Sequence, residues 1–157
     1  MNPVEPHISP ERVRELFDYN STTGEFWRRS SGIIYSSLSV WIDGRTYEIG
    51  RVIWCWYYKE WPPLDKYVDH EDKLRHHNWI TNLRLATPTQ NASNQGRKGT
   101  YHKGVTYRSD VSSKPWVARI SISGTRIHLG FYDTHDEAAE AYREACVEFH
   151  GEFACYD

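Results

Sequence analysis

The sequence has no long apolar run, and none of its segments reaches the roughly 18 to 20 apolar residues that a membrane-spanning helix needs. Its start, Met1 to Glu5, lacks the basic-then-apolar pattern of a secretion signal. The three cysteines, Cys55, Cys146 and Cys155, form no Cys-x-x-Cys pair, which supports neither a zinc ribbon nor a disulfide framework. We therefore expect a cytoplasmic protein with reduced, mostly buried thiols, no membrane association and no obligate protein partner.

Aromatic residues are plentiful, with 7 Trp and 11 Tyr. Such a load suits compact domains that have little aliphatic core, and it also suits the stacking of bases. Of these two interpretations we favour packing.

Charge is distributed unevenly along the chain, although the formal total is only -2. Residues 70–132 have a local charge of +7, residues 133–157 have -7, and residues 1–69 have -2. A basic middle segment is typical of phosphate contact, and the alternative is an ordinary solvated polar surface.

The N-terminal third predicts a helix that leads into a small antiparallel sheet. Ser9 followed by Pro10 is a typical helix start, and we expect that helix to end near Asn20. Residues 25–28 read as a strand, and 38–42 with 46–49 flank Asp43-Gly44, a strong hairpin signal. Residues 51–59 (RVIWCWYYK) fit a buried helix or a strand; we favour the helix, ended by Pro62-Pro63.

The second half predicts one short helix, a pair of strands and a longer helix. Thr87-Pro88-Thr89-Gln90 is a capping box that predicts a helix over about 88–95, with Asn91 and Asn94 on one face. Alternation predicts strands over 116–123 and 126–131, whose wet face includes Arg119, Arg126 and His128. A capping box at 134–137 opens a helix whose apolar stripe would be Ala138, Ala141, Tyr142, Ala145 and Phe149, with Glu140, Glu144 and Glu148 pointing outward.

The residues best suited to chemistry lie between Asp69 and Asn91. Phosphodiester cleavage needs a base that takes a proton from water, and an imidazole such as His70 titrates near neutrality. It also needs a hard cation held by oxygen ligands, which Asp69 and Asn91 supply. An Asp-His pair alone is a weak signal.

The spacing strengthens that signal, because Asn82 lies twelve and Asn91 twenty-one residues after His70. This pattern resembles the HNH nucleases of the ββα-metal fold found in bacteriophages and mobile introns. The resemblance extends to Leu16-Phe17-Asp18-Tyr19, Thr23-Gly24-Glu25-Phe26-Trp27, Ile42-Asp43-Gly44-Arg45 and Arg51-Val52-Ile53-Trp54. It implies Asp69 and Asn91 as ligands of one Mg²⁺ or Mn²⁺ ion, His70 as general base, and Asn82 as a brace for the motif that helps to hold His70.

The chain departs from that family at several positions. Gly50 stands before Arg51 where many relatives have His, Glu71 replaces a common apolar residue, and His77-Asn78-Trp79 replaces Asp-Asn-Arg. None of these changes removes a predicted ligand or the base. We interpret His76 and His77 as exposed loop residues rather than a second metal site.

Residues 101–157 resemble the DNA-binding domain of plant ethylene-response factors, which also occurs in phage homing endonucleases. The matching segments are Tyr101-His102-Lys103-Gly104-Val105, Trp116-Val117-Ala118-Arg119-Ile120, Arg126-Ile127-His128-Leu129-Gly130, Phe131-Tyr132-Asp133-Thr134 and Glu137-Ala138-Ala139-Glu140-Ala141-Tyr142. The resemblance implies a three-stranded antiparallel sheet in the major groove, with contacts from Lys103, Arg108, Arg119, Arg126 and His128. Thr106, where the plant domains usually have Arg, implies moderate affinity and relaxed specificity.

Together these features predict an α+β protein. Residues 1–95 would be an HNH nuclease unit of the ββα-metal type, 96–100 a linker, and 101–157 an ethylene-response-factor-like module of three strands packed on one helix. We expect a metal-dependent endonuclease of a phage or mobile element that nicks double-stranded DNA in the host cytoplasm. The alternatives are an inactive DNA-binding regulator and a protein that binds or cleaves RNA.

Overall fold

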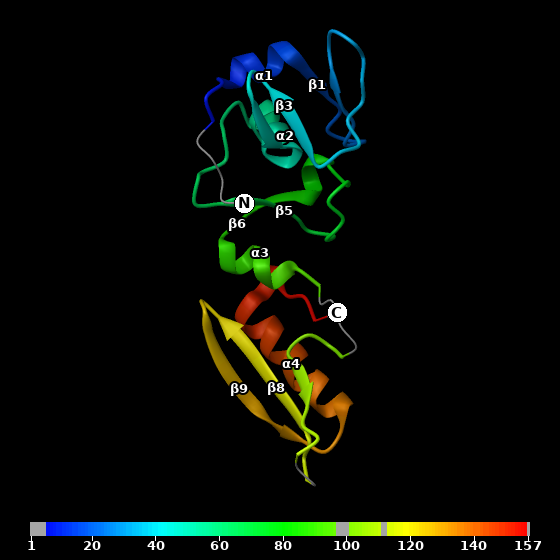
Figure 1. Ribbon diagram of the computed structural model, residues 1–157, viewed down its shortest axis with the longest axis vertical. Helices are drawn as coiled ribbons and strands as arrows, with labels where there is room; N and C mark the ends of the chain where they lie inside the picture. The colour runs from blue at the N-terminus through cyan, green and yellow to red at the C-terminus, as the bar shows by residue number, and fades with distance from the viewer. Residues whose placement is uncertain (1–5, 97–100, 111–112, 157) are drawn as a thin grey trace. The chain divides into compact units, whose positions relative to one another are not determined.

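The computed structural model describes residues 6–96, 101–110 and 113–156, and the chain divides into two compact units, Met1–Pro88 and Thr89–Asp157 (Figure 1). Helices and small antiparallel sheets are mixed in both, in agreement with the predicted α+β class. The expected linker at 96–100 falls almost entirely on residues 97–100, which lie outside the described residues. Among the residues that are described, no helix is long and apolar enough to cross a membrane.

The first unit consists of short helices and three two-stranded antiparallel sheets. Its helices are α1 (Pro10–Leu16), α2 (Ile49–Tyr58) and the 3-10 turn η1 (Ile80–Asn82). The sheets pair β1 (Phe17–Tyr19) with β2 (Phe26–Arg28), β3 (Ser39–Ile42) with β4 (Arg45–Glu48), and β5 (Tyr67–His70) with β6 (Leu83–Ala86).

Helix α1 begins as predicted, because the Ser9 side chain accepts a hydrogen bond from the Arg12 N–H. The expected end near Asn20 is wrong. The helix stops at Leu16, and Phe17 to Tyr19 extend as β1 to pair with β2. The sequence pattern missed this strand because its partner lies beyond the next turn and is not a near neighbour in the chain.

The β3–β4 hairpin and helix α2 confirm two local predictions. Asp43 and Gly44 form the two-residue turn with φ of 43° and 94°, as the right-handed twist of a tight hairpin requires. Helix α2 ends at Tyr58, with Lys59 in a left-handed conformation, before Pro62-Pro63 is reached. The prolines therefore do not end the helix themselves.

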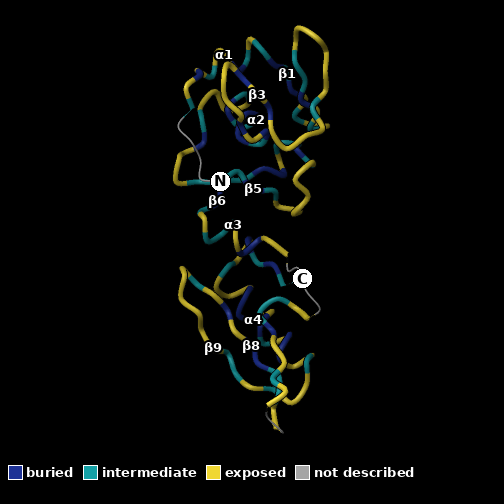
Figure 2. Tube along the Cα trace, viewed as in Figure 1, coloured by how far each residue is buried: buried dark blue, intermediate teal, exposed yellow. Residues whose placement is uncertain are grey.

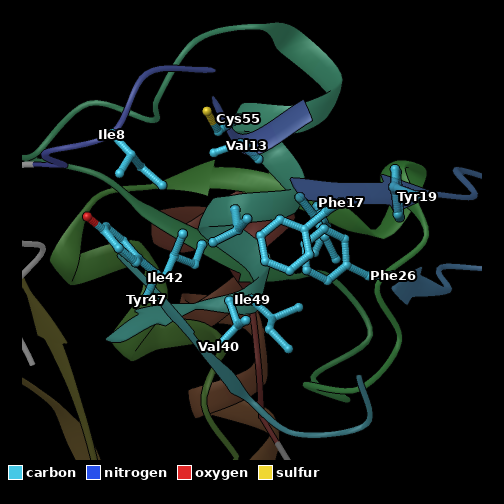
Figure 3. Packing of buried hydrophobic residues seen from close by; sticks show 13 residues of the cluster. Ile8, Val13, Phe17, Tyr19, Phe26, Val40, Ile42, Tyr47, Ile49 and Cys55 are labelled. Atoms are coloured by element: carbon cyan, nitrogen blue, oxygen red, sulfur yellow. The ribbon is translucent and has the colours of Figure 1, made fainter. Parts of the chain in front are cut away.

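The core of the first unit forms around α2, β1 and β2. Phe17 stacks on Phe26 with ring centroids 4.8 Å apart, and Val13 and Ile49 pack beside them (Figure 3). Cys55 is buried in the same cluster, and burial raises the pKa of its thiol to about 12. All three cysteines are free and buried, as predicted.

Buried Arg51 ties α2 to the segment that leads into β5. Its guanidinium donates to the carbonyl oxygens of Pro62 and Lys66, each at 2.8 Å. A buried charge requires such partners, so this residue of the motif is structural. It sets the start of β5, the strand that ends on Asp69 and His70.

The second unit contains a three-stranded antiparallel sheet in the order β7–β8–β9, with α4 packed on one face (Figure 1). The elements are α3 (Pro88–Asn94, most of which belongs to this unit), β7 (Val105–Tyr107), β8 (Trp116–Ile122), β9 (Thr125–Tyr132), α4 (His135–His150) and the 3-10 turn η2 (Gly151–Phe153). Helix α3 agrees closely with the expected range of 88–95. The predicted capping box of α4 is present, since Thr134 and Glu137 exchange hydrogen bonds.

A β-bulge corrects the predicted alternation of the two long strands. The register is Arg119 opposite His128 but Ala118 opposite Gly130, so Leu129 is the extra residue on β9. Beyond the bulge the phase of β9 shifts, and Phe131 pairs with Val117. Phe131, expected on the buried face, therefore lies on the face of Val117 and Arg119 and is 45% exposed. Val117 stays on the face predicted for it but is only 1% exposed there, so its predicted exposure is wrong.

The buried stripe of α4 also differs from the prediction. Ala138, Tyr142 and Ala145 are buried as expected, but Phe149 is exposed. Ala139 and Cys146, outside the predicted stripe, are buried in the cluster with the sheet, and Ala141 of the stripe is only partly buried. The three predicted outward glutamates, Glu140, Glu144 and Glu148, are exposed. Figure 2 shows the burial of the chain along its Cα trace, with both buried and exposed stretches in the second unit.

Candidate active site

The β5–β6 hairpin positions the Asp-His pair at the end of β5. The strands are antiparallel, with Asp69 opposite Arg84 and His70 opposite Leu83. Successive side chains of a strand point to opposite faces, so Asp69 and His70 project in different directions. Asp69 is buried and His70 is half-buried.

Asp69 forms an ion pair with its cross-strand partner. The Arg84 Nε atom donates to Asp69 Oδ2 at 3.1 Å, and both side chains are largely shielded from solvent. A buried carboxylate needs a partner of this kind to remain charged. The pair therefore compensates the charge of this carboxylate within the hairpin.

The His70 imidazole is held by a buried amide. Its Nε2 atom lies 3.0 Å from Asn78 Oδ1. Gly50 lies close to the ring as well, because a Cβ atom added to Gly50 would lie 3.8 Å from the His70 Cε1 atom. The departure at Gly50 thus lies directly beside the imidazole, where many relatives of the predicted family have a His.

Buried Asn82 holds the loop that connects β5 to η1. Its Oδ1 accepts from the Asp72 N–H at 3.0 Å, and its Nδ2 donates to the His77 carbonyl oxygen at 2.7 Å and to Asp72 Oδ1 at 2.9 Å. Partial burial would raise the pKa of Asp72, but hydrogen bonds from Leu74 N–H, the Asn82 amide and the His77 ring lower it below its ordinary value. The loop thus has an acidic anchor that is charged at neutral pH.

The two histidines predicted as exposed loop residues differ from each other. His76 is exposed, but His77 is half-buried. His77 stacks on Trp79 with centroids 4.4 Å apart, and its Nδ1 lies 2.5 Å from Asp72 Oδ2. The departure His77-Asn78-Trp79 therefore forms a local packing unit that stabilises the loop.

The predicted second ligand, Asn91, lies on α3 and is half-buried. Asp69 belongs to the first unit and Asn91 to the second, and each by itself offers an oxygen donor of the hard kind that Mg²⁺ accepts. Within the part of the chain that the structure describes, no cluster of three His, Cys, Asp or Glu side chains could hold a metal. The donor chemistry of the predicted pair fits a weakly held Mg²⁺ and does not suit a zinc site.

Three of the five predicted DNA contacts share the sheet face opposite α4. Arg119 pairs with His128 and Ser121 pairs with Arg126, so Arg119, Arg126 and His128 lie on one face, which we call the outer face. All three are exposed. Phe131 joins them because of the bulge, with its ring 4.5 Å from that of His128. The Arg108 guanidinium lies 5.7 Å from the Phe131 ring and pairs with exposed Asp110.

The fifth predicted contact, Lys103, is placed elsewhere. Its Nζ donates to the carbonyl oxygens of Ser93 at 2.7 Å and Gln95 at 2.8 Å, at the C-terminal end of α3. A cation there satisfies backbone carbonyls and complements the helix dipole. The ring of His150 lies 3.3 Å from the Ser93 hydroxyl, so α3 is held at two points within the second unit.

These positions predict different consequences for Lys103 and Arg119. Lys103→Met keeps the aliphatic stem but removes the cap of α3, and we expect it to lower the free energy of unfolding by about 1 kcal/mol with little change in DNA affinity. Arg119→Ala is expected to weaken duplex binding without loss of stability, and to reduce the dependence of binding on salt. Urea unfolding and gel shifts at two salt concentrations measure both. If Lys103→Met instead weakened DNA binding and left the stability unchanged, Lys103 would be a DNA contact rather than a cap of α3.

Two residues of the site were missed from sequence. The sequence places Asn78 in the segment suited to chemistry, eight residues after His70, but its spacing indicates no role for it, whereas the fold brings it against the imidazole. Phe131 was assigned to the core because strict alternation allows for no bulge. A glycine within a strand, here Gly130 with φ of 153°, is a signal for a bulge that could have found it.

A curated relative is 36% identical to this chain over 92 residues: a protein of Acanthamoeba polyphaga mimivirus named an uncharacterized HNH endonuclease. The match covers 59% of this chain and 47% of the relative, so the chain spans about half the length of the curated relative that it matches. No family model matches. No solved structure matches either.

Proposed function

We propose that this protein is a metal-dependent DNA endonuclease of the HNH type that nicks duplex DNA. The observation on which the proposal rests is the β5–β6 hairpin, in which the His70 imidazole contacts the Asn78 amide while Asp69 is paired with Arg84. The name of the mimiviral relative supports nuclease activity at the level of the family.

In this proposal His70 is the general base that accepts a proton from the attacking water. Asn82 braces the loop through Asp72 and the His77 carbonyl, and so keeps the end of β5 in position. Asp69 and Asn91 would hold the Mg²⁺ or Mn²⁺ ion, with Asn91 included on its sequence spacing. When bound, the cation neutralises charge that develops on the phosphate.

The outer face is the proposed DNA-binding surface. Arg119 and Arg126 supply positive charge, and a guanidinium suits both phosphates and guanine edges. The acidic side chains of α4, the helix on the opposite face of the sheet, are exposed away from these arginines. Duplex DNA would therefore meet a basic surface in the second unit without repulsion from the acidic helix.

A plasmid assay tests the proposal. Supercoiled plasmid is incubated with the protein and Mg²⁺ or Mn²⁺, and we expect open-circular product that does not form in EDTA. One base and one cation cleave one strand at a time, so nicked circles should precede linear DNA. A gel shift without cleavage under either cation would instead identify a DNA-binding regulator, which the outer face alone could serve. Preferential binding or cleavage of single-stranded RNA in competition would identify an RNA-directed protein.

A further inference from the structure

We propose that Asn78 is a positioning residue that keeps the proton of neutral His70 on Nε2 and the lone pair on Nδ1. The inference rests on the proposed role of His70 as general base, and it names the nitrogen that would accept the proton from water. It concerns one hydrogen bond, between His70 Nε2 and Asn78 Oδ1 at 3.0 Å.

The chemistry of the two groups sets the direction of this hydrogen bond. An amide oxygen only accepts, so a hydrogen bond to Asn78 Oδ1 requires a proton on Nε2. In neutral imidazole the other nitrogen then has the lone pair. A general base must present a lone pair to water, so with the proton on Nε2 the base nitrogen of the proposed mechanism is Nδ1.

The backbone of Asn78 is held rigidly enough to orient the ring. The Tyr19 hydroxyl donates to the Asn78 carbonyl oxygen at 2.7 Å, in a buried contact between residues far apart in the chain. Next to it, Ile80 N–H donates to the Ser21 carbonyl oxygen at 3.2 Å. Asn78 itself is buried, so water does not compete for its amide.

Gly24 makes this close approach possible. A Cβ at Gly24 would lie 2.7 Å from the Trp79 nitrogen and 2.9 Å from the Asn78 carbonyl carbon, both of them backbone atoms. Gly24 also has φ of 77°, which disfavours any side chain. The β1–β2 turn therefore packs against the backbone of Asn78, and the loop cannot shift away from His70 without breaking that packing.

An uncharged partner suits this site. A carboxylate at position 78 would also accept from Nε2, but it would add negative charge where the DNA phosphate must approach. Asn78 orients the imidazole without that repulsion, while the neighbouring charge of Asp69 is balanced by Arg84.

The test reads the tautomer directly. Long-range ¹H–¹⁵N spectra of metal-free protein in EDTA, at a pH where His70 is neutral, distinguish Nε2–H from Nδ1–H. We expect the Nε2–H form alone in the unaltered protein and in Asn78→Asp, whose carboxylate also accepts, and a mixture of both forms in Asn78→Ala. A dominant Nδ1–H form in the unaltered protein, or an Asn78→Ala spectrum identical to it, overturns the inference. The first of these outcomes needs no variant to fold.

Kinetics supply a second readout. Loss of a partner that orients a site residue typically costs about 10- to 100-fold in activity. We expect Asn78→Ala to lower kcat for nicking in this range with KM little changed, because Asn78 contacts the base and not the DNA. An unaltered kcat overturns the inference. If the unaltered protein does not nick DNA at all, the proposed function fails, while the spectra still decide the role of Asn78.

Discussion

His70→Ala is expected to slow plasmid nicking by about 10²- to 10⁴-fold, which is the usual contribution of a general base. The imidazole lies at the end of β5, and its Nε2 atom lies 3.0 Å from Asn78 Oδ1. Binding to duplex DNA should persist in the variant, because the outer face belongs to the second unit. Nicking rates at saturating protein and Mg²⁺ provide the measurement.

His76→Ala is the matched control for this experiment. His76 follows β5 in the loop that leads to η1, and it is exposed. Among the described residues, the one ring that its imidazole contacts is that of His77. We expect it to nick at the rate of the unaltered protein. If His70→Ala and His76→Ala nick equally fast, His70 is not the base, and a circular dichroism spectrum of each variant excludes unfolding as the cause of a loss.

Among the described glycines of the second unit, Gly104 is the one at which we expect substitution by alanine to be most destabilising. Its Cβ would lie 2.1 Å from ring atoms of Tyr142 on α4 and 2.6 Å from the Arg119 carbonyl oxygen on β8. Gly104 also has φ of 78°. Strain and overpacking together should cost about 3 kcal/mol or more, a large share of the total stability of a domain.

Gly124→Ala separates the packing cost from the backbone cost. Gly124 has nearly the same φ, 82°, but nothing lies within 4 Å of the Cβ that it would acquire. We expect it to lower the free energy of unfolding by about 1 kcal/mol, measured in urea beside Gly104→Ala. Similar losses for the two variants would mean that the contact between Gly104 and Tyr142 does not limit the approach of α4 to the sheet. Gel shifts should follow stability, because the outer face depends on that packing.

Features that depend on a few neighbouring residues were predictable from the sequence. The Ser9 cap, the Asp43-Gly44 turn and the capping box at Thr134 are all present, because each is decided by side chains within four residues. Helix α3 also agrees closely with its predicted range. The end of α1 was not predictable in this way, since β1 exists only through its pairing with β2.

The candidate site depends partly on the spacing of residues in the sequence and partly on contacts that only the fold creates. The spacing of Asp69, His70 and Asn82 is a property of the sequence, and it was enough to single out the segment as the candidate site. Contacts between distant residues had to come from the fold: Tyr19 with Asn78, Arg84 with Asp69, and Lys103 with the end of α3. A long, flexible basic side chain such as Lys103 can reach either a ligand or a backbone carbonyl. The residue type alone does not show which of these partners it contacts.

The sequence by itself determined the charge division and the types of most helices and strands, and it singled out the candidate residues for hydrolysis. Only the tertiary structure decided which side chains meet: that a bulge turns Phe131 onto the outer face, and that Asn78 holds His70. The physical reason is that periodicity and capping act over one or two turns of chain. Register shifts and buried hydrogen bonds arise from packing between segments that are many residues apart.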